Sequence, residues 1–170
     1  NGLLDAVKRL DYGDRKELRS EEGQELKTEQ MLRRRMEGYS IGGNETFHFH
    51  EDGFCCVAAK MKNMQDVEKR YEQRGMDLFF RSLFSILEQA LQGYDEYNVL
   101  LYDRNTITVF VSFSKTPSMQ EKQLKIRRLV DHLRATLQNY LDLSLKIGVS
   151  GLCYGKDKIR MSWEQAQMSM

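Results

Sequence analysis

Residues 97–113, YNVLLYDRNTITVFVSF, decide how the rest of the chain is organised. They predict two short strands joined by a tight turn, because β-branched and aromatic residues fill both runs and polar turn formers separate them. The second run alternates between apolar and other residues, as expected of a strand with one buried face. Its apolar positions are Ile107, Val109, Val111 and Phe113.

Amphipathic helices are predicted on both sides of this hairpin. Residues 66–92 place apolar side chains at steps of three and four, with Asn63 or Asp66 available to cap the start and Gly93 ending the helix. Residues 121–141 repeat the pattern. The apolar positions of the two helices are Phe79, Leu83, Ile86, Leu87, Ala90 and Leu91, then Ile126, Leu129, Val130, Leu133, Leu137 and Leu141.

Two further strands complete the pattern. Residues 54–61 are apolar until Lys60, which predicts a central strand buried on both faces. Residues 143–150 alternate like the second hairpin strand. A last helix is predicted over residues 159–170, with one apolar side formed by Trp163, Ala166 and Met170.

The order β-α-β-β-α-β predicts an α+β fold, the ferredoxin-like arrangement, in which both helices pack on one face of an antiparallel sheet. The side chains expected to face the helices are Ile107, Val109, Val111, Leu145, Ile147 and Val149. The opposite face is expected to meet water, because it would carry Thr106, Thr108, Ser112, Ser144 and Lys146.

We divide the chain into a helical linker or signalling segment at 1–40 and a folded domain at 41–170. The first segment has few apolar residues among many charges, so its helix is expected to be solvated or to pair with a second copy of the chain. A homodimer is therefore the partner arrangement that the sequence allows. The chain starts without Met and stops inside a helical pattern, so we interpret it as an excised, C-terminally truncated piece of a longer protein.

Composition narrows the classes of function. The 170 residues carry 26 basic and 25 acidic side chains, so bulk charge gives no reason to expect nucleic-acid or membrane binding. No apolar run reaches the length of a membrane span. The three cysteines have no framework spacing, which favours buried, reduced thiols in an intracellular protein.

Two polar clusters have competing interpretations. His48, His50, Glu51 and Asp52 could hold a metal, but no further His or Cys spacing supports a site, and we favour a polar loop and strand start. Basic clusters on the predicted helices are interpreted as solvated faces, because acids interrupt them and aromatic platforms are missing. Their members are Arg33, Arg34 and Arg35, then Lys125, Arg127 and Arg128.

Residues 146–150, KIGVS, and 162–166, SWEQA, resemble the end of a GGDEF-type, diguanylate cyclase-like domain. They are most similar to the degenerate GGDEF-like middle domain of AraC-type bacterial transcription regulators. Residues 31–38, MLRRRMEG, are similar to the charged helix that precedes the first strand in that group. The resemblance implies a nucleotide-cyclase-like version of the ferredoxin-like core, preceded by a linker helix.

The resemblance also implies what this chain has lost. Active cyclases carry GGDEF in the hairpin turn, where residues 102–106 here read YDRNT. The two glycines that let a backbone approach a phosphate are absent, and so is the acidic pair that would hold Mg²⁺. The late first strand offers AAKMK at 58–62 instead of a metal-binding Asp. We therefore expect no enzymatic activity and no cofactor.

The expected function is regulatory. The domain would couple an upstream input to a DNA-binding helix-turn-helix module outside this chain. The parent would be a cytoplasmic response regulator of a two-component system or a membrane-anchored sensor-regulator. The alternative is a sensor for a nucleotide or metabolite, bound at the remnant cyclase loop by Tyr102, Asp103, Arg104 and Asn105. An active nucleotidyl cyclase is the third, least favoured hypothesis.

Overall fold

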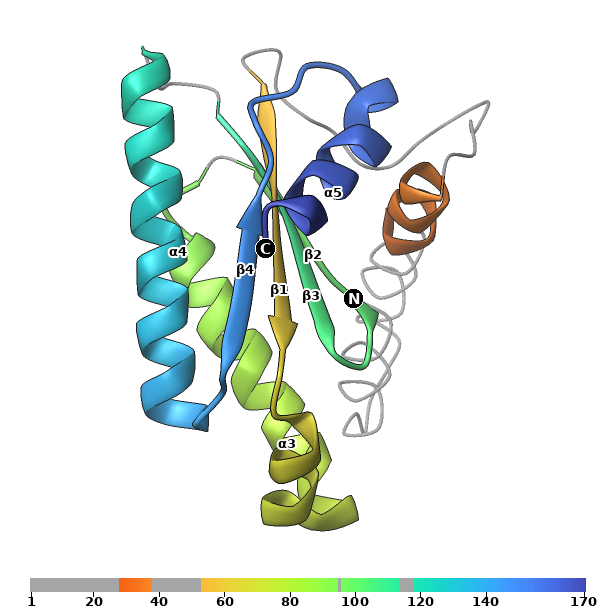
Figure 1. Cartoon of the computed structure of the whole chain (residues 1–170), viewed down its shortest axis with the longest axis vertical. Coiled ribbons are helices and arrows are strands. Elements are labelled where there is room, and N and C mark those ends of the chain that lie inside the picture. The colour runs from red at the N-terminus through yellow and green to blue at the C-terminus, as the bar shows by residue number, and fades with distance from the viewer. Residues whose placement is uncertain (1–27, 38–52, 95, 114–117) are drawn as a thin grey trace, which may run out of the picture.

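A computed structural model describes residues 28–37, 53–94, 96–113 and 118–170. Among the described residues, a helical segment at 28–36 comes first. Figure 1 shows a central sheet with two helices on one side and α5 and the segment 28–36 on the other. The elements that follow this segment are β1 (Phe54–Met61), α3 (Met64–Leu91), β2 (Glu96–Asp103), β3 (Thr106–Ser112), α4 (Met119–Leu141), β4 (Leu145–Val149), the 3₁₀ helix η1 (Lys156–Lys158) and α5 (Ile159–Met168).

The sheet has the order β2-β3-β1-β4, and its three strand pairs are antiparallel. The predicted β-α-β-β-α-β arrangement is therefore confirmed. Strand β1 lies between β3 and β4, and every residue in it except Lys60 is buried. This agrees with the prediction of a central strand, because a strand with neighbours on both edges and layers on both faces has no route to water.

One face of the sheet packs on α3 and α4, as predicted. Ile107, Val109 and Val111 are fully buried there, and Leu145 is buried at the sheet edge. The facing helix residues recur at the predicted helical spacing. These buried helix side chains include Phe79, Phe80, Leu83, Phe84, Leu87, Leu129, Leu133 and Leu137.

The start of α3 differs from its expected form. Asn63 occupies the N-cap position but makes no side-chain cap bond. Its amide instead donates to the carbonyl of Asp142 and accepts from the backbone N–H of Ser144, both at 2.9 Å. Asn63 thus ties the start of α3 to the connection between α4 and β4. Glu72 has φ 56° and ψ 179°, so it interrupts α3. The part before it also reaches the core, through Met64 and Val67.

Most of the second face of the sheet is buried, so the expectation that it meets water is wrong for its three β3 residues. Thr106, Thr108 and Ser112 are buried, whereas Ser144 and Lys146 are exposed. The reason is that large apolar side chains share this face with the threonines and require cover. This second cluster contains Phe54, Cys56, Ala58, Leu100 and Phe110 from the strands, with Leu32, Met36, Cys153, Ile159 and Ala166 packed on them.

Helix α5 lies very close to the strand below it. A Cβ added at Gly148 of β4 would overlap the carbonyl oxygen of Ala166 and lie 2.8 Å from Ser169 Oγ. Ser169 Oγ also donates to the carbonyl of Val149, and it accepts from the N–H of the same residue at 2.8 Å. Glycine at position 148 is therefore what lets the end of α5 dock on β4.

The three cysteines are free and buried. Cys55 belongs to the cluster under α3 and α4, and Cys56 to the cluster on the other face. Adjacent strand residues point to opposite faces, so this placement confirms the prediction of small buried hydrophobes.

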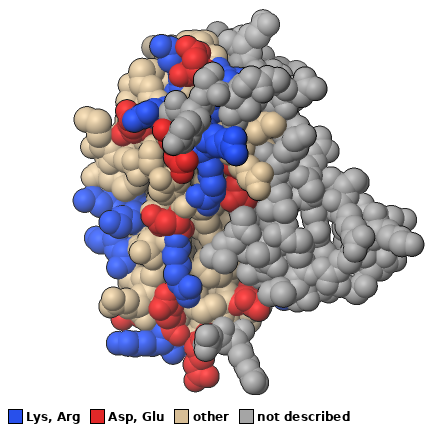
Figure 2. All heavy atoms as spheres, turned by 90° about the vertical axis from the view of Figure 1, so that its right-hand side faces the viewer, with Lys and Arg blue, Asp and Glu red and all other residues tan. Residues whose placement is uncertain are grey.

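The surface formed by the described residues mixes both signs of charge. Figure 2 shows Lys and Arg side chains interleaved with Asp and Glu over the visible part of one side. This agrees with the formal net charge of +1 for the whole sequence. In the described part of the chain, no helix is both long enough and apolar enough to span a bilayer.

Candidate functional site

The hairpin turn between β2 and β3 is the position at which the sequence predicted a remnant ligand site. Tyr102 is half-buried, and Asp103, Arg104 and Asn105 are exposed. Asp103 pairs with Thr106 across the turn after an irregularity in the register. The four residues therefore lie together at one end of the sheet.

The polar groups of this turn bind to the protein itself. Asp103 Oδ1 accepts from the N–H of Asn105 at 2.8 Å, which confirms the predicted turn chemistry. Arg104 Nε donates to Glu68 Oε1 at 2.9 Å, and the carbonyl of Asn105 accepts from the N–H of Met61 at 2.7 Å. The turn is thus fastened to the start of α3 and to the end of β1. Ligand binding by these residues stays a prediction.

The donor set near the turn does not fit Mg²⁺. A magnesium site needs near-octahedral oxygen ligands, commonly one or two carboxylates with bound phosphates. Here Asp103 binds the turn backbone and Glu68 pairs with Arg104. Lys60 stands directly opposite Lys146 on β4, which places two positive charges near the end of β1. Nowhere among the described residues do three His, Cys, Asp or Glu gather as metal ligands.

The histidine-rich cluster singled out in the sequence, with the carboxylates that follow it, lies outside the described residues. Its interpretation as a polar loop rather than a metal site stays a prediction.

Tyr102 joins two helices that are far apart in the sequence. Its ring packs against Trp163 of α5, with 4.6 Å between the ring centroids. The guanidinium carbon of Arg33 lies 5.6 Å from the centroid of the same ring. Arg33 also donates to the carbonyl of Tyr102 at 2.6 Å and to that of Leu101. The segment 28–36 and α5 therefore meet at the end of β2.

The expectation of a solvated Arg33 is wrong. Its guanidinium donates hydrogen bonds to two carbonyls at the end of β2. The neighbouring Leu32 and Met36 are almost fully buried and hold the helix on the sheet, which brings Arg33 within reach of these carbonyls. Arg34 is exposed as predicted. The thin apolar stripe of Leu32 and Met36 was the sequence signal for this docking.

A pocket of about 340 Å³ lies at the other end of the sheet. It opens between the first half of α4 and the residues that end and follow β4, with Cys55 of β1 beneath. Burial raises the pKa of the Cys55 thiol to about 12, and the charge of Lys122 opposes part of this rise. None of the four turn residues lines this pocket, and sequence reasoning did not predict it.

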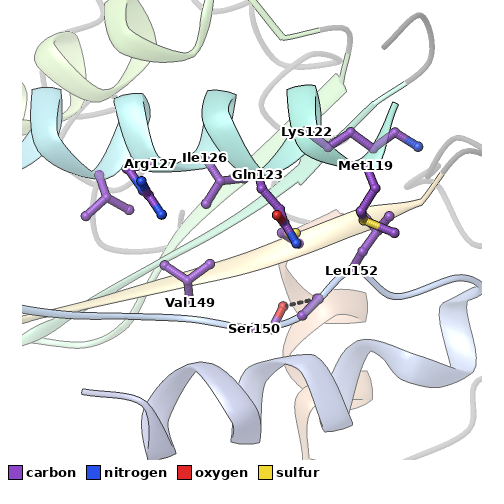
Figure 3. Close-up of a pocket in the computed structure, with 11 residues that line it drawn as sticks. Met119, Lys122, Gln123, Ile126, Arg127, Val149, Ser150 and Leu152 are labelled. Atoms are coloured by element: carbon purple, nitrogen blue, oxygen red, sulfur yellow. Dashed lines mark hydrogen bonds between the residues drawn. The ribbon is translucent and has the colours of Figure 1, made fainter. Parts of the chain in front are cut away.

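The side chains that line the pocket are mainly apolar. Figure 3 shows Gln123 and Arg127 extending from α4 toward the strands, with Val149 facing them. Met119 and Leu152 close the end of the pocket near the start of α4. This combination of an apolar body and a few polar groups is typical of small-molecule sites.

The fold resembles that of solved GGDEF domains. Among solved structures, the chain is similar to the GGDEF domain of FimX from Pseudomonas aeruginosa, with 16% identity, a TM-score of 0.52, and 70% of this chain and 73% of that chain covered. It is also similar to an EAL/GGDEF domain protein from M. capsulatus, with 11% identity, a TM-score of 0.51, and 81% and 86% covered. No curated protein matches the chain.

At these identities the two structures support a shared fold only. The family is shown by a separate comparison, in which the profile of the GGDEF-like domain matches residues 47–170, well over half of the chain. On that match, and on a sheet and helices arranged as in the solved GGDEF domains, the chain belongs to the family of GGDEF-like domains.

Proposed function

We propose that this GGDEF-like domain is a non-catalytic, signal-transmitting part of an AraC-type bacterial transcription regulator. It couples an upstream input to a DNA-binding helix-turn-helix module outside this chain, in the cytoplasm. The observation that carries the proposal is the position of Tyr102, which contacts the segment 28–36 and α5 at once.

These contacts form a continuous physical connection. Arg33 holds the carbonyls of Leu101 and Tyr102, and the Tyr102 ring packs on Trp163. A second link joins the same two helices, because Arg160 donates to the carbonyl of Glu37 at 3.5 Å. A shift of the segment 28–36 on the sheet would therefore change the contacts that hold α5. Helix shifts of this kind are a common way for proteins to transmit a switch.

The turn chemistry supports a role without catalysis. A phosphate-binding loop needs free backbone N–H groups or glycines that allow close approach. Here the N–H of Asn105 is bound by Asp103, and Arg104 is paired with Glu68. The resemblance of residues 31–38, 146–150 and 162–166 to the middle domain of AraC-type regulators supports the assignment to that group.

The absence of catalysis is tested by incubating the chain with GTP and either Mg²⁺ or Mn²⁺, beside an active cyclase as a positive control. We expect no cyclic dinucleotide, because the turn supplies no metal-binding carboxylate pair. Product formed above the background of a heat-denatured sample would overturn the non-catalytic part of the proposal.

The coupling role is tested in the full-length reading frame, by measuring transcription from a target promoter with and without the input. Arg33→Ala should change the induced-to-uninduced ratio, because it removes the bonds from the segment 28–36 to the carbonyls of Leu101 and Tyr102 in β2. Arg34→Ala is the matched control, since this neighbouring arginine is exposed. Identical ratios in both variants and the parent, at equal protein levels, would contradict the transmission mechanism.

The alternative, a sensor for a nucleotide or metabolite at the hairpin turn, keeps the exposed side chains of Asp103, Arg104 and Asn105 as candidate contacts. A dose-dependent rise in melting temperature with a nucleotide or metabolite, abolished by Arg104→Ala, would favour it. The predicted pairing with a second copy of the chain is tested separately, by light scattering on the purified protein.

A further inference from the structure

The pocket between α4 and β4 is separate from the hairpin turn. Cys55, which lies beneath the pocket, pairs with Val111 near the start of β1. The hairpin turn directly precedes Thr106, which pairs with Lys60 near the end of β1. The two sites therefore lie at opposite ends of β1. A ligand in this pocket would leave the turn residues untouched.

The volume of the pocket sets the size of a ligand. An apolar cavity of about 150 Å³ in a protein interior accommodates one benzene molecule. A pocket of about 340 Å³ is roughly twice as large, enough for a fused two-ring system or a chain of comparable bulk. The apolar walls that would contact such a body are Met119, Ile126, Val130, Val149 and Leu152.

The charged groups at the pocket are all positive. Arg127 and Lys122 both line it, and no described Asp or Glu does. The charge of Lys122 opposes part of the rise that burial causes in the pKa of the Cys55 thiol beneath the pocket. Arg127 is exposed, forms no ion pair or hydrogen bond with another described residue, and extends toward Val149 (Figure 3).

Guanidinium groups bind carboxylates through two parallel hydrogen bonds, and they do so more strongly where apolar neighbours exclude water. The Gln123 amide, one helical turn before Arg127, adds a neutral donor on the same side of α4. The apolar body of a ligand would thus lie between the apolar side chains of α4 and Val149 and Leu152, while its anionic group meets Arg127.

We propose that this pocket binds a small amphipathic carboxylate, whose apolar part lies against Ile126, Val149 and Leu152 and whose carboxylate binds Arg127. Lys122 contributes a second positive charge, and Gln123 a hydrogen bond. Neutral compounds of the same shape bind more weakly because they leave Arg127 without a partner.

The test uses naphthoate as a rigid two-ring carboxylate probe, with naphthalene methanol as its neutral counterpart. Isothermal titration on the whole chain should give saturable binding of naphthoate, with a Kd between about 10 µM and 1 mM for a ligand of this size. The neutral compound should bind at least about tenfold more weakly.

Two arginine variants separate a specific carboxylate contact from general charge attraction. Arg127→Gln should weaken naphthoate binding about tenfold. Arg128→Gln, at the next residue of the same helix and outside the pocket lining, should stay within about twofold of the parent. Equal weakening in both variants would show non-specific attraction and overturn the proposal.

Backbone NMR on the unmodified chain locates the probe without relying on any variant. Naphthoate should shift the amide signals of residues 149–152 and of the first half of α4. No saturable shift up to about 5 mM, a concentration above any useful affinity, would overturn the proposal. Shifts confined to residues 102–105 would also overturn it and would favour a ligand site at the hairpin turn.

Discussion

The ring of Tyr102, at the end of β2, packs on the ring of Trp163 in α5 with 4.6 Å between their centroids and 44° between their planes. Trp163 is the single tryptophan of the chain. Its fluorescence therefore reports on the point where the hairpin, α5 and the segment 28–36 meet.

Replacing Tyr102 with Ala should move the Trp163 emission to longer wavelength, because removal of the neighbouring ring lets water reach the indole. The unfolding free energy should fall by about 1–2 kcal/mol, since a paired aromatic ring contributes contact energy beyond its buried area. Fluorescence-monitored urea unfolding measures both effects.

Tyr102→Phe should keep the emission of the parent, because the ring stack does not need the hydroxyl. Tyr140→Ala is a second control, since this tyrosine is 76% exposed and lies on α4. Unchanged emission in Tyr102→Ala would mean that the stack is not formed in solution.

Gly148→Ala should destabilise the protein by about 2–3 kcal/mol, because the new methyl group would overlap the carbonyl of Ala166 and overpack the contact between α5 and β4. Gly93→Ala is the matched control, since no atom lies within 4 Å of a Cβ at that position. Urea unfolding of both variants checks the prediction, which fails if Gly148→Ala is as stable as Gly93→Ala.

Alkaline pH should reduce stability. Burial raises the pKa of Cys55 from 9.0 to about 12 and raises that of Cys56 well above 9.0. Burial also raises the pKa of Tyr94 to about 12. Folding therefore favours the protonated groups. The contribution of these protonated groups to the unfolding free energy is complete below pH 9, and it is lost as the pH rises toward 12.

The expected slope is a fall of at most about 1.4 kcal/mol per pH unit for each buried thiol. It is measured by urea unfolding between pH 8 and about pH 11 under reducing conditions. Cys55→Ala should show a shallower decline than the parent over this range. Parallel profiles for the two proteins would contradict the assignment of Cys55 as a buried neutral thiol.

Asn63→Ala should lower the unfolding free energy by about 1–2 kcal/mol, because it removes the bonds to Asp142 and Ser144 that join α3 to the α4–β4 connection. Asn63→Asp should lose less, since a carboxylate still accepts from the N–H of Ser144. Thermal unfolding ranks the three proteins. Equal stability of the Ala variant and the parent would contradict this role.

Most of the layer formed by α3, α4 and the sheet could be predicted from the sequence. The alternation at residues 106–113 and the helical spacing at 121–141 are local patterns, and each indicates which side of its strand or helix is apolar. The strand order then follows from the element order and the short hairpin. Boundaries moved by one or two residues, as at the start of α4, where Ser118 accepts from the N–H of Glu121.

The cover of the second sheet face could not be predicted in the same way. Phe110 stood among threonines on a face expected to meet water, and the apolar residues beside it come from other strands. These residues form an apolar surface only when β1, β2 and β3 lie side by side. Among the described residues, α5, the segment 28–36 and Cys153 cover that surface. Leu100 and Phe110, noted together, were the available signal.

The candidate sites divide in the same manner. The sequence alone shows that residues 102–106 lack the glycines and the acidic pair, because phosphate and Mg²⁺ binding at this turn depends on the residue types of one short segment. The pocket could not be predicted from the sequence, because its walls come from β1, α4 and the residues that end and follow β4. No local pattern marks side chains that converge only after folding.

The sequence by itself determined the element order, the helix-facing side of the sheet and the GGDEF-like character, because periodicity and short motifs are properties of neighbouring residues. The tertiary structure alone decided that Arg33 and Tyr102 meet, that Trp163 packs on Tyr102, and that a pocket opens beside Arg127. These contacts join segments far apart in the chain, and their geometry exists only once the sheet has brought those segments together.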